Sequence, residues 1–376
     1  MAPVSVAIVG CGRIFPVYAR GLARFPERVR IAWCTDIIPE RARSGAALTQ
    51  AAHFGCNEAM LADPSVAVVI NLTPPTEHAT VIRSALDAGK HVFTEKPLAI
   101  TTAEAAPLVT LARERGLALG SAADTFLGSA GQTARQVIDS GELGEIFGFT
   151  LFSAYSRAET WHPDPGFLFV RGGGPVLDAG PYFIGALVNL LGPVRRVTGH
   201  MVQGATVRQV TARDRLVEQV NVEVPTHAAA LLELRSGAVG TMTASFDVWS
   251  TDVPAIEIYG RNGMLSVPHP NWFSGDVTLR LNRRTDPQVI PPVTPPVPGE
   301  GMGGTMLRGY GVMDLIDSVA GYPQRTSGVL ALHVLEVLEA VRLSSATGAA
   351  VAVECPAERP APLTSRQLAG WGGEPT

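Results

Sequence analysis

The sequence predicts an α/β fold: an N-terminal Rossmann-type, doubly wound parallel sheet, followed by a C-terminal α+β domain with an open, mostly antiparallel sheet. Over the first 124 residues, short apolar runs alternate with helical patterns, as in sheets whose parallel strands are joined by helices. After residue 125, strand-like runs follow one another through short turns, which favours antiparallel pairing. We therefore expect a Rossmann-type domain at 1–124, an α+β domain at 125–350, and a tail at 351–376.

The elements of the first domain follow from apolar periodicity and from the residues that interrupt it. Strands are predicted where short apolar runs end at Gly, Asp or Pro, and helices where apolar residues recur at helical spacing. The predicted strands are 4–9, 30–35, 66–72, 91–94 and 117–121. The predicted helices begin after Ile14, at Pro39, at Thr76 and at Thr101, where Thr101 and Glu104 form a capping box.

The second domain is expected to begin with a helix over 132–140. A second helix starts near Asp178 and ends at Gly192, and an amphipathic helix around 329–338 carries His333 in a structural role. The predicted strands are 146–153, 196–202, 227–234, 239–246 and 255–259.

Composition and charge exclude several classes of function. The chain has 376 residues and a formal net charge of −4, with no basic stripe that could neutralise a row of phosphates, so we expect no nucleic-acid partner. No apolar run approaches the roughly 18 to 20 residues of a membrane span, and the N-terminus enters a strand-like run rather than a signal peptide. The four cysteines form no C-x-x-C pair and the histidines lack zinc-ligand spacing. We therefore expect no metal and a reducing, cytoplasmic location.

The turn Gly10-Cys11-Gly12 follows a strand and precedes a helix, which is the context of a dinucleotide-binding turn. Phe15 stands where the third glycine of that fingerprint is expected, so a plain strand-to-helix turn is the alternative. Asp36 ends the second strand, where a carboxylate can accept hydrogen bonds from an adenosine ribose and repel the 2′-phosphate of NADP. The pattern favours NAD over NADP, unless Asp36 is only a solvated strand-end residue.

Glu95-Lys96-Pro97 ends another strand, at the edge of the sheet where ligands bind in this fold. A partly buried lysine at that edge has a lowered pKa and can exchange a proton with a substrate hydroxyl. A surface lysine in a turn is the alternative interpretation.

These motifs occur in a familiar order, together with Thr73-Pro74-Pro75, His78 and the later segment Gly172–Tyr182. Taken together, the sequence resembles the glucose–fructose oxidoreductase / inositol dehydrogenase (Gfo/Idh/MocA) family. The resemblance implies NAD(P)-linked oxidation or reduction at a carbinol carbon of a sugar, polyol or cyclic alcohol, with Lys96 in the active site. It also implies a homodimer or homotetramer formed through the open sheet of the second domain. The cofactor-site residues carried by the family motifs are Gly10, Gly12, Arg13, Ile14, Thr73, Pro74, His78, Glu95 and Lys96.

Asp178 and Tyr182 complete the expected catalytic set with Lys96. Many members of the family carry a histidine where this chain has Tyr182, so the resemblance leaves the proton carrier open between Lys96 and Tyr182. The two residues are four positions apart, which places them on one face of a helix. Asp178 as a helix N-cap and Tyr182 as a packed aromatic are the alternatives.

Asp124, Trp161 and His162 are the expected substrate-binding residues. Asp124 lies at the domain junction, and an indole beside an imidazole suits a sugar; a helix cap and a surface loop are the alternatives. The sequence thus predicts an NAD-dependent oxidoreductase that acts on a sugar, glycoside, amino sugar or cyclitol. An NAD-dependent glycosidase that uses transient oxidation and a non-catalytic NAD(P)-binding regulator remain as alternatives.

Overall fold

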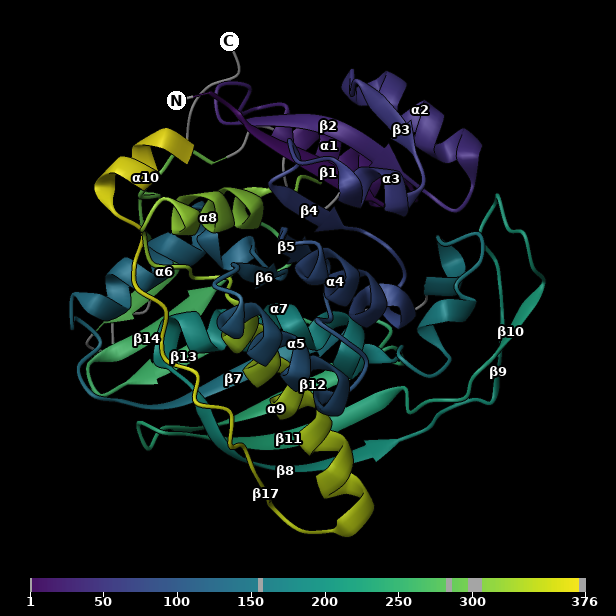
Figure 1. Cartoon of the computed structure of the whole chain (residues 1–376). Helices are drawn as coiled ribbons and strands as arrows, with labels where there is room; N and C mark the ends of the chain where they lie inside the picture. Colours follow the sequence, from purple (N-terminus) through teal and green to yellow (C-terminus); the bar gives the residue numbers. More distant parts are fainter. Residues whose placement is uncertain (1, 155–157, 282–285, 297–305, 372–376) are drawn as a thin grey trace. The chain divides into compact units, whose positions relative to one another are not determined.

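The computed structural model describes residues 2–154, 158–281, 286–296 and 306–371, which fall into two compact units (Figure 1). The first unit comprises the described residues within Met1–Gly128, Val297–Leu332 and Leu363–Thr376. The second comprises those within Ser129–Pro296 and His333–Pro362. The predicted fold class is confirmed, because one unit contains a parallel sheet and the other a mostly antiparallel one.

The first unit contains a six-stranded parallel sheet with the order β3-β2-β1-β4-β5-β6. In this sheet Val9 pairs with both Thr35 and Asn71, and Asn71 pairs with Thr94. The strands therefore end level with one another, at an edge that we call the carboxyl edge. The strand bounds are β1 Val4–Val9, β2 Val29–Thr35, β3 His53–Gly55, β4 Val68–Asn71, β5 His91–Thr94 and β6 Leu119–Ser121.

Helices pack against this sheet; α2 contacts β2 and β3, and α4 contacts β4 and β5. One half of the predicted capping box is confirmed at α5, where the Thr101 side chain accepts the backbone N–H of Glu104 at 3.3 Å, while the Glu104 side chain accepts the N–H of Ile100 at 3.3 Å. The helices of the first unit are α1 Phe15–Leu22, α2 Pro39–Thr49, α3 Asn57–Ala62, α4 His78–Asp87, α5 Thr102–Glu114, α8 Tyr310–Val319 and α10 Ser365–Trp371, with short 3-10 turns at η1 Pro75–Glu77 and η2 Thr125–Leu127.

The first unit includes segments that the sequence assigned to a second domain and to a tail. Helices α8 and α10 both belong to it, so these assignments of residues 125–350 and 351–376 differ from the structure. The buried Arg325 joins these two late segments of the first unit. It pairs with Asp314 at 3.2 Å and donates to the Gln367 side chain of α10 at 3.0 Å. Contacts between residues so far apart in the chain leave no periodic signal in the local sequence.

The second unit contains a nine-stranded sheet with the order β16-β15-β14-β13-β7-β12-β11-β8-β17. Its neighbouring strands are antiparallel except for β7 and β12, which are parallel. A separate two-stranded ribbon is formed by β9 and β10. The strand bounds are β7 Ile146–Ala154, β8 Val194–Val202, β9 Val207–Gln209, β10 Gln219–Asn221, β11 His227–Leu234, β12 Val239–Ser245, β13 Ile256–Gly260, β14 Gly263–Val267, β15 Thr278–Leu281, β16 Gln288–Val289 and β17 Val351–Ala352.

The helices of the second unit are α6 Ser129–Asp139, α7 Pro175–Leu191 and most of α9 Gly328–Thr347, with 3-10 turns at η3 Ala158–Thr160 and η4 Gly166–Leu168. Helix α7 packs against β7, β11 and β12 and is buried over nearly its whole length. It begins three residues before the predicted start at Asp178, because Pro175 favours the first helical position after Gly174. Pro181 therefore lies inside the helix, and Gly192 ends it as predicted.

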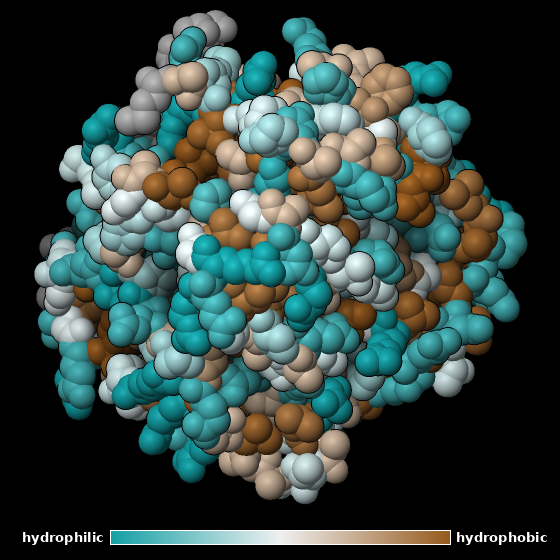
Figure 2. Space-filling model, viewed as in Figure 1, coloured by the Kyte–Doolittle hydropathy of each residue, from teal (hydrophilic) through white to brown (hydrophobic). Residues whose placement is uncertain are grey.

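Among the described residues, no helix is long and apolar enough to cross a membrane. On the face shown in Figure 2, hydrophobic and hydrophilic residues are interspersed.

The packing of the segment before α8 against α1 predicts that position 21 must be glycine. A Cβ added to Gly21 of α1 would overlap the carbonyl oxygen of Arg308, just before α8. Because a backbone atom cannot move aside as a side chain can, Gly21→Ala should lower the free energy of unfolding by about 1–3 kcal/mol, despite the better helix propensity of alanine. Urea unfolding measures this effect. Gly148→Ala is the control, because its Cβ would meet its nearest neighbour at 3.4 Å; equal stability losses in the two variants would contradict the prediction.

Candidate active site

The turn after β1 is held in a conformation that requires glycine. Gly10 has a φ of +93°, and its N–H donates to the carbonyl of Thr35 at 2.8 Å. A Cβ at this position would lie 2.8 Å from the carbonyl oxygen of Leu72. The chain thus leaves β1 in the gap beside β4, where the strand order reverses and where ligands bind in open α/β sheets.

Asp36 closes the same turn from the end of β2. One carboxylate oxygen accepts the N–H of Cys11 at 2.8 Å, and the other accepts the N–H of Ile38 at 2.9 Å. Each carboxylate oxygen can accept a further hydrogen bond. Asp36 is therefore positioned beside the glycine turn with acceptor capacity left for ribose hydroxyls.

The structure explains why the third glycine of the fingerprint is missing. Phe15 is buried, and a Cβ at Gly45 of α2 would lie 3.0 Å from its ring. The glycine that permits close packing thus stands on α2 rather than on α1. Within the first turn of α1, Pro16 has no N–H and the N–H of Val17 already donates to the carbonyl of Ile14 at 3.0 Å, so a ligand phosphate would be held by the glycine turn that precedes the helix. The residues present fit a dinucleotide.

Ile37 was not predicted as a site residue. It directly follows Asp36, and 97% of its side chain is exposed. An exposed apolar surface beside Asp36 is of a kind on which an aromatic ring such as adenine packs. Two consecutive isoleucines directly after a strand end were the available signal in the sequence.

The end of β5 is fixed by a buried carboxylate. Glu95 accepts the hydroxyl of Tyr18 at 2.9 Å with one oxygen and the N–H of Lys96 at 2.9 Å with the other. Burial, and then the nearby Glu95 charge, raise the pKa of Tyr18, so its phenol stays protonated as the donor. The peptide bond between Lys96 and Pro97 is cis. Together these contacts hold the backbone that carries the Lys96 side chain.

Lysine is rare in this chain, a signal that the sequence analysis did not use. Of the 30 lysine and arginine residues, only Lys90 and Lys96 are lysines. Lys90 is buried and its ammonium donates to the carbonyl of Asp63 at 2.7 Å. Lys96 is half-buried at the carboxyl edge. A guanidinium stays charged in proteins, whereas an ammonium can release its proton, so lysine at this edge has a chemical use that arginine lacks.

Thr73 and His78 lie at the neighbouring strand end. The hydroxyl of Thr73 donates to the Asn71 side chain at 2.6 Å, and Pro74 beside it is exposed. His78 is fully buried, with its ring nitrogens near the carbonyl oxygens of Thr73 and Pro97. Burial lowers the pKa of His78. The ring therefore contacts the backbone of both segments rather than facing an open surface.

Asp124 is also fully buried in the first unit. Its carboxylate accepts the N–H of Gly311 at 2.7 Å, at the start of α8. Burial raises the pKa of Asp124, and the Arg308 guanidinium opposes this shift. These contacts give the residue a structural task, and its assignment to substrate binding stays a prediction.

Asp178 and Tyr182 belong to the second unit. Asp178 is the fourth residue of α7, and Gly174 is the N-cap, so the interpretation of Asp178 as an N-cap is wrong. Tyr182 follows one turn later; Asp178 is half-buried and Tyr182 buried. Because Lys96 belongs to the first unit, its cooperation with these two residues stays a prediction.

Trp161 and His162 follow the short turn η3 in the second unit. Their rings meet edge to face with centroids 5.5 Å apart, and the ring of Phe167 lies 5.2 Å from that of His162. Trp161 and Phe167 are both more than half exposed. The three side chains form an exposed aromatic surface.

Within the described residues, His333, Glu336 and Cys355 are grouped closely enough to hold a metal, with ligand atoms within 4.8 Å of one another. Their atoms have other tasks: His333 Nε2 accepts the N–H of Val194 at 3.1 Å, and Glu336 accepts the N–H groups of Glu354 and Cys355 at 2.8 Å each. Burial raises the pKa of Cys355 to about 11 and lowers that of His333 to about 4. Because the histidine and the carboxylate already accept backbone N–H groups, this group fits a structural role.

Comparison with known proteins identifies the family. A model described as "Oxidoreductase family, NAD-binding Rossmann fold" matches residues 4–122, and one described as "GFO/IDH/MocA C-terminal domain" matches residues 132–266. The dTDP-3,4-didehydro-2,6-dideoxy-alpha-D-glucose 3-reductase of Saccharopolyspora spinosa is 32% identical over 75% of this chain and 80% of its own length.

Two further proteins extend the comparison. An uncharacterised oxidoreductase of Schizosaccharomyces pombe is 29% identical over 54% of this chain, which spans 55% of the length of that relative. The structure of levoglucosan dehydrogenase in complex with NADH has a TM-score of 0.78 at 20% identity. It covers 94% of this chain and 99% of that one, a likeness of fold. The chain belongs to the GFO/IDH/MocA family of oxidoreductases.

Proposed function

We propose that this protein is an NAD-dependent oxidoreductase that moves a hydride between the nicotinamide and a carbinol or keto carbon of a sugar-like molecule. The observation that carries the proposal is Lys96, one of two lysines in a chain otherwise rich in arginine, at the carboxyl edge that also holds the glycine turn and Asp36. The proposed reaction needs a group that can give up and take back a proton, which an ammonium can do and a guanidinium cannot.

The residues of the first unit divide the task of holding the dinucleotide. The turn from Gly10 to Gly12 would bind the pyrophosphate, with Arg13, Ile14, Thr73 and Pro74 beside it, and Asp36 would accept the ribose hydroxyls. When bound, NAD supplies the acceptor for the hydride. As the C–H bond of the carbinol breaks, the Lys96 amine takes the hydroxyl proton and becomes an ammonium. In the reverse direction the ammonium returns that proton to the oxygen.

Tyr182 and Asp178 are proposed to assist from α7. A phenol near Lys96 can relay the proton, and a carboxylate one helical turn away can orient the phenol or bind a substrate hydroxyl. Trp161 and His162 would contact the substrate, because the C–H faces of a sugar ring pack well on aromatic rings. The sugar substrates in the names of the Saccharopolyspora reductase and of levoglucosan dehydrogenase support this substrate class.

A cytoplasmic location is part of the proposal. The four cysteines are free thiols, and Cys34 and Cys355 are buried. Free thiols persist in a reducing compartment, which is also where a dissolved NAD pool is found.

Incubation of the protein and NAD with a panel of sugars, glycosides, amino sugars and cyclitols tests the function. Net formation of NADH, followed by its absorbance, is the expected result with one class of substrate. Release of an aglycone without net NADH would support the glycosidase. Tight NAD binding without turnover of any substrate would support the regulator.

Replacement of Lys96 by arginine keeps the positive charge but removes the exchangeable proton. Lys96→Arg and Lys96→Ala should both lower kcat by about 10² to 10⁴, the range for a lost acid–base group. NADH binding, measured by fluorescence titration, should stay near the wild-type value in both. The control is Lys90→Arg. In the wild type the Lys90 ammonium donates to the backbone carbonyl of Asp63, away from the proposed reaction. Near-normal turnover by Lys96→Arg would contradict the mechanism. If Tyr182→Phe lowers kcat as much as the Lys96 variants do, the Tyr182 phenol takes part in the proton transfer as well.

Asp36 should decide the choice of cofactor. Its carboxylate repels the 2′-phosphate of NADP, so the wild type should bind NADH more tightly than NADPH. Asp36→Ser should bring the affinities for NADH and NADPH closer together, because it weakens NADH binding and removes the repulsion of the NADPH 2′-phosphate. Fluorescence titrations with both cofactors measure the ratio, with Asp63→Ser as the control, since Asp63 bonds to the indole of Trp33 instead. A wild-type preference for NADPH would overturn the assignment of Asp36.

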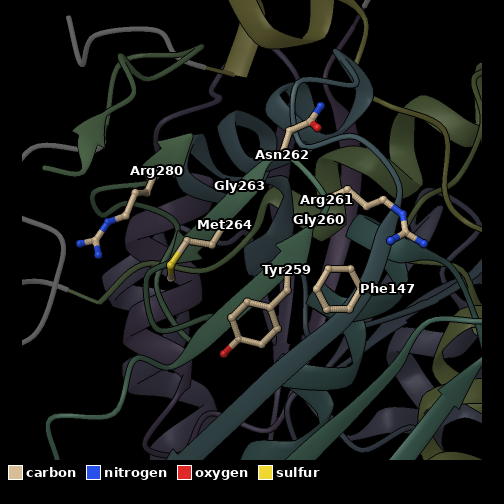
Figure 3. Close-up of a pocket in the computed structure, with 8 residues that line it drawn as sticks. All are labelled: Phe147, Tyr259, Gly260, Arg261, Asn262, Gly263, Met264 and Arg280. Carbon is tan, nitrogen blue, oxygen red and sulfur yellow. The ribbon is translucent and has the colours of Figure 1, made fainter. Parts of the chain in front are cut away.

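Oligomerisation through the nine-stranded sheet is proposed from its exposed face. On this outer face, Leu231 pairs with Thr241 and Glu233 with Val239, whereas the alternate residues Ala230 and Leu232 are buried. Exposed apolar side chains at Phe147, Val202, Leu231 and Val239 give the face an apolar character that a second copy could cover. At one end of the face, an open pocket is lined by the adjacent rings of Phe147 and Tyr259, with Arg261 and Arg280 nearby (Figure 3).

Leu231→Arg should convert the proposed homodimer or homotetramer into a smaller species, because it places a charge within an interface that would exclude water. Light scattering coupled to size-exclusion chromatography gives the mass of each species. Leu48→Arg introduces the same charge at an exposed leucine of α2 and should leave the mass unchanged. A wild-type monomer, or equal effects of the two variants, would contradict this interface.

A further inference from the structure

His78 joins two segments of the carboxyl edge. It is the first residue of α4 and is fully buried. Its Nδ1 lies 2.6 Å from the carbonyl oxygen of Pro97, which follows Lys96. Its Nε2 lies 2.9 Å from the carbonyl oxygen of Thr73, which follows β4. One imidazole thus spans the segment that carries Lys96 and the segment that would face the cofactor.

Each of these segments is also tied to its own strand end. The backbone N–H of Thr73 donates to the Asn71 side chain at 3.2 Å, and Glu95 accepts the N–H of Lys96 at 2.9 Å. The strand ends are themselves joined, because the Asn71 side chain donates to the Thr94 hydroxyl at 3.1 Å and the N–H of Glu95 donates to the Asn71 carbonyl at 2.9 Å. Beyond the strand ends, the His78 ring contacts both the Thr73 and the Pro97 carbonyls.

Both partners of the ring are carbonyl oxygens, which only accept hydrogen bonds. Burial lowers the pKa of His78, and the two carbonyl contacts and the Glu95 charge oppose this shift. The neutral ring carries one N–H and can donate to one carbonyl at a time. The two nitrogens therefore have separable effects, one on each segment.

We propose that His78 is a positioning residue that couples the cofactor segment to the Lys96 segment. Its Nδ1 side orients the Lys96–Pro97 peptide, and its Nε2 side orients the Thr73 segment. The residue acts through these backbones and does not touch the substrate. The role of Lys96 rests on the proposed function, but the coupling can be measured without turnover.

Two substitutions separate the two sides of the ring. The amide nitrogen of asparagine reaches approximately the place of Nδ1, and that of glutamine approximately the place of Nε2. His78→Asn should therefore keep the contact with Pro97 and lose the contact with Thr73, and His78→Gln should do the reverse. Both variants keep a buried polar group, so a general loss of packing affects them alike.

Two readouts that need no substrate follow the two segments. NADH fluorescence titration reports on the Thr73 segment. Reductive ¹³C-methylation of amines followed by NMR reports on Lys96, because Lys90 is the only other lysine and serves as the internal reference. We expect His78→Asn to weaken NADH binding about fivefold, the loss of one neutral hydrogen bond, and to leave the Lys96 titration unchanged. His78→Gln should shift the Lys96 titration and keep NADH binding within about twofold.

The control is His91→Asn, since His91 accepts the N–H of Ala118 with its Nδ1 at the opposite end of β5. This variant should change neither readout. Equal changes of both readouts in both His78 variants, or no change in either, would overturn the coupling and leave His78 as a packing residue.

A measurement on the wild type covers the case in which the variants do not fold. Addition of NADH should shift both ring ¹⁵N resonances of His78, and unchanged resonances in the NADH-bound protein would overturn the proposal. Failure of the proposed function is distinct: it would appear as absence of NADH binding by the wild type, or as an unimpaired Lys96→Arg variant.

Discussion

The parallel pairing of β1 with β4 is the constraint on which the candidate site depends. It joins strands that are far apart in the chain, and it sets Val9 level with Asn71. The turn after β1 must then pass the carbonyl of Leu72 so closely that only glycine fits at position 10. Since β2 and β5 are in register with these strands, Asp36 and Lys96 arrive at the same edge. Residues between Gly10 and Lys96 in the sequence are thus brought to one edge by backbone hydrogen bonding.

Buried polar groups then give that edge its fixed shape. Glu95 and Asp314 are buried and matched by donors: the Tyr18 hydroxyl for Glu95, and the Arg325 guanidinium with nearby N–H groups for Asp314. Asp124 accepts the N–H of Gly311 with Oδ2, whereas its buried Oδ1 has no hydrogen-bond partner among the described residues. A buried carboxylate without such partners costs several kcal/mol, so these bonds exclude most alternative loop conformations. The loops of the first unit are thus positioned by buried hydrogen bonds and an ion pair as much as by apolar packing.

The sequence was informative where the signal is local. Strands such as Val68–Asn71 are uninterrupted apolar runs because both faces of a parallel sheet are covered, and the glycine turn, Asp36 and Lys96 stand at their ends. The strand β3 and the ribbon of β9 and β10 are short and largely exposed, so they carry no apolar period and were missed. The placement of α8 and α10, and the burial of His78 and Asp124, arise from contacts between distant residues that no local pattern encodes.

The discontinuity of the first unit has a consequence for biosynthesis. A ribosome releases the residues of β1 to β6 early, but the partners of Arg325 and Asp317 include Gln367. These buried polar contacts of the first unit therefore cannot form until α10 has left the exit tunnel, although the strands can pair long before. During that interval the nascent chain would hold a paired parallel sheet whose contacts with α10 are still missing, and such a partly folded state is the one that chaperones bind.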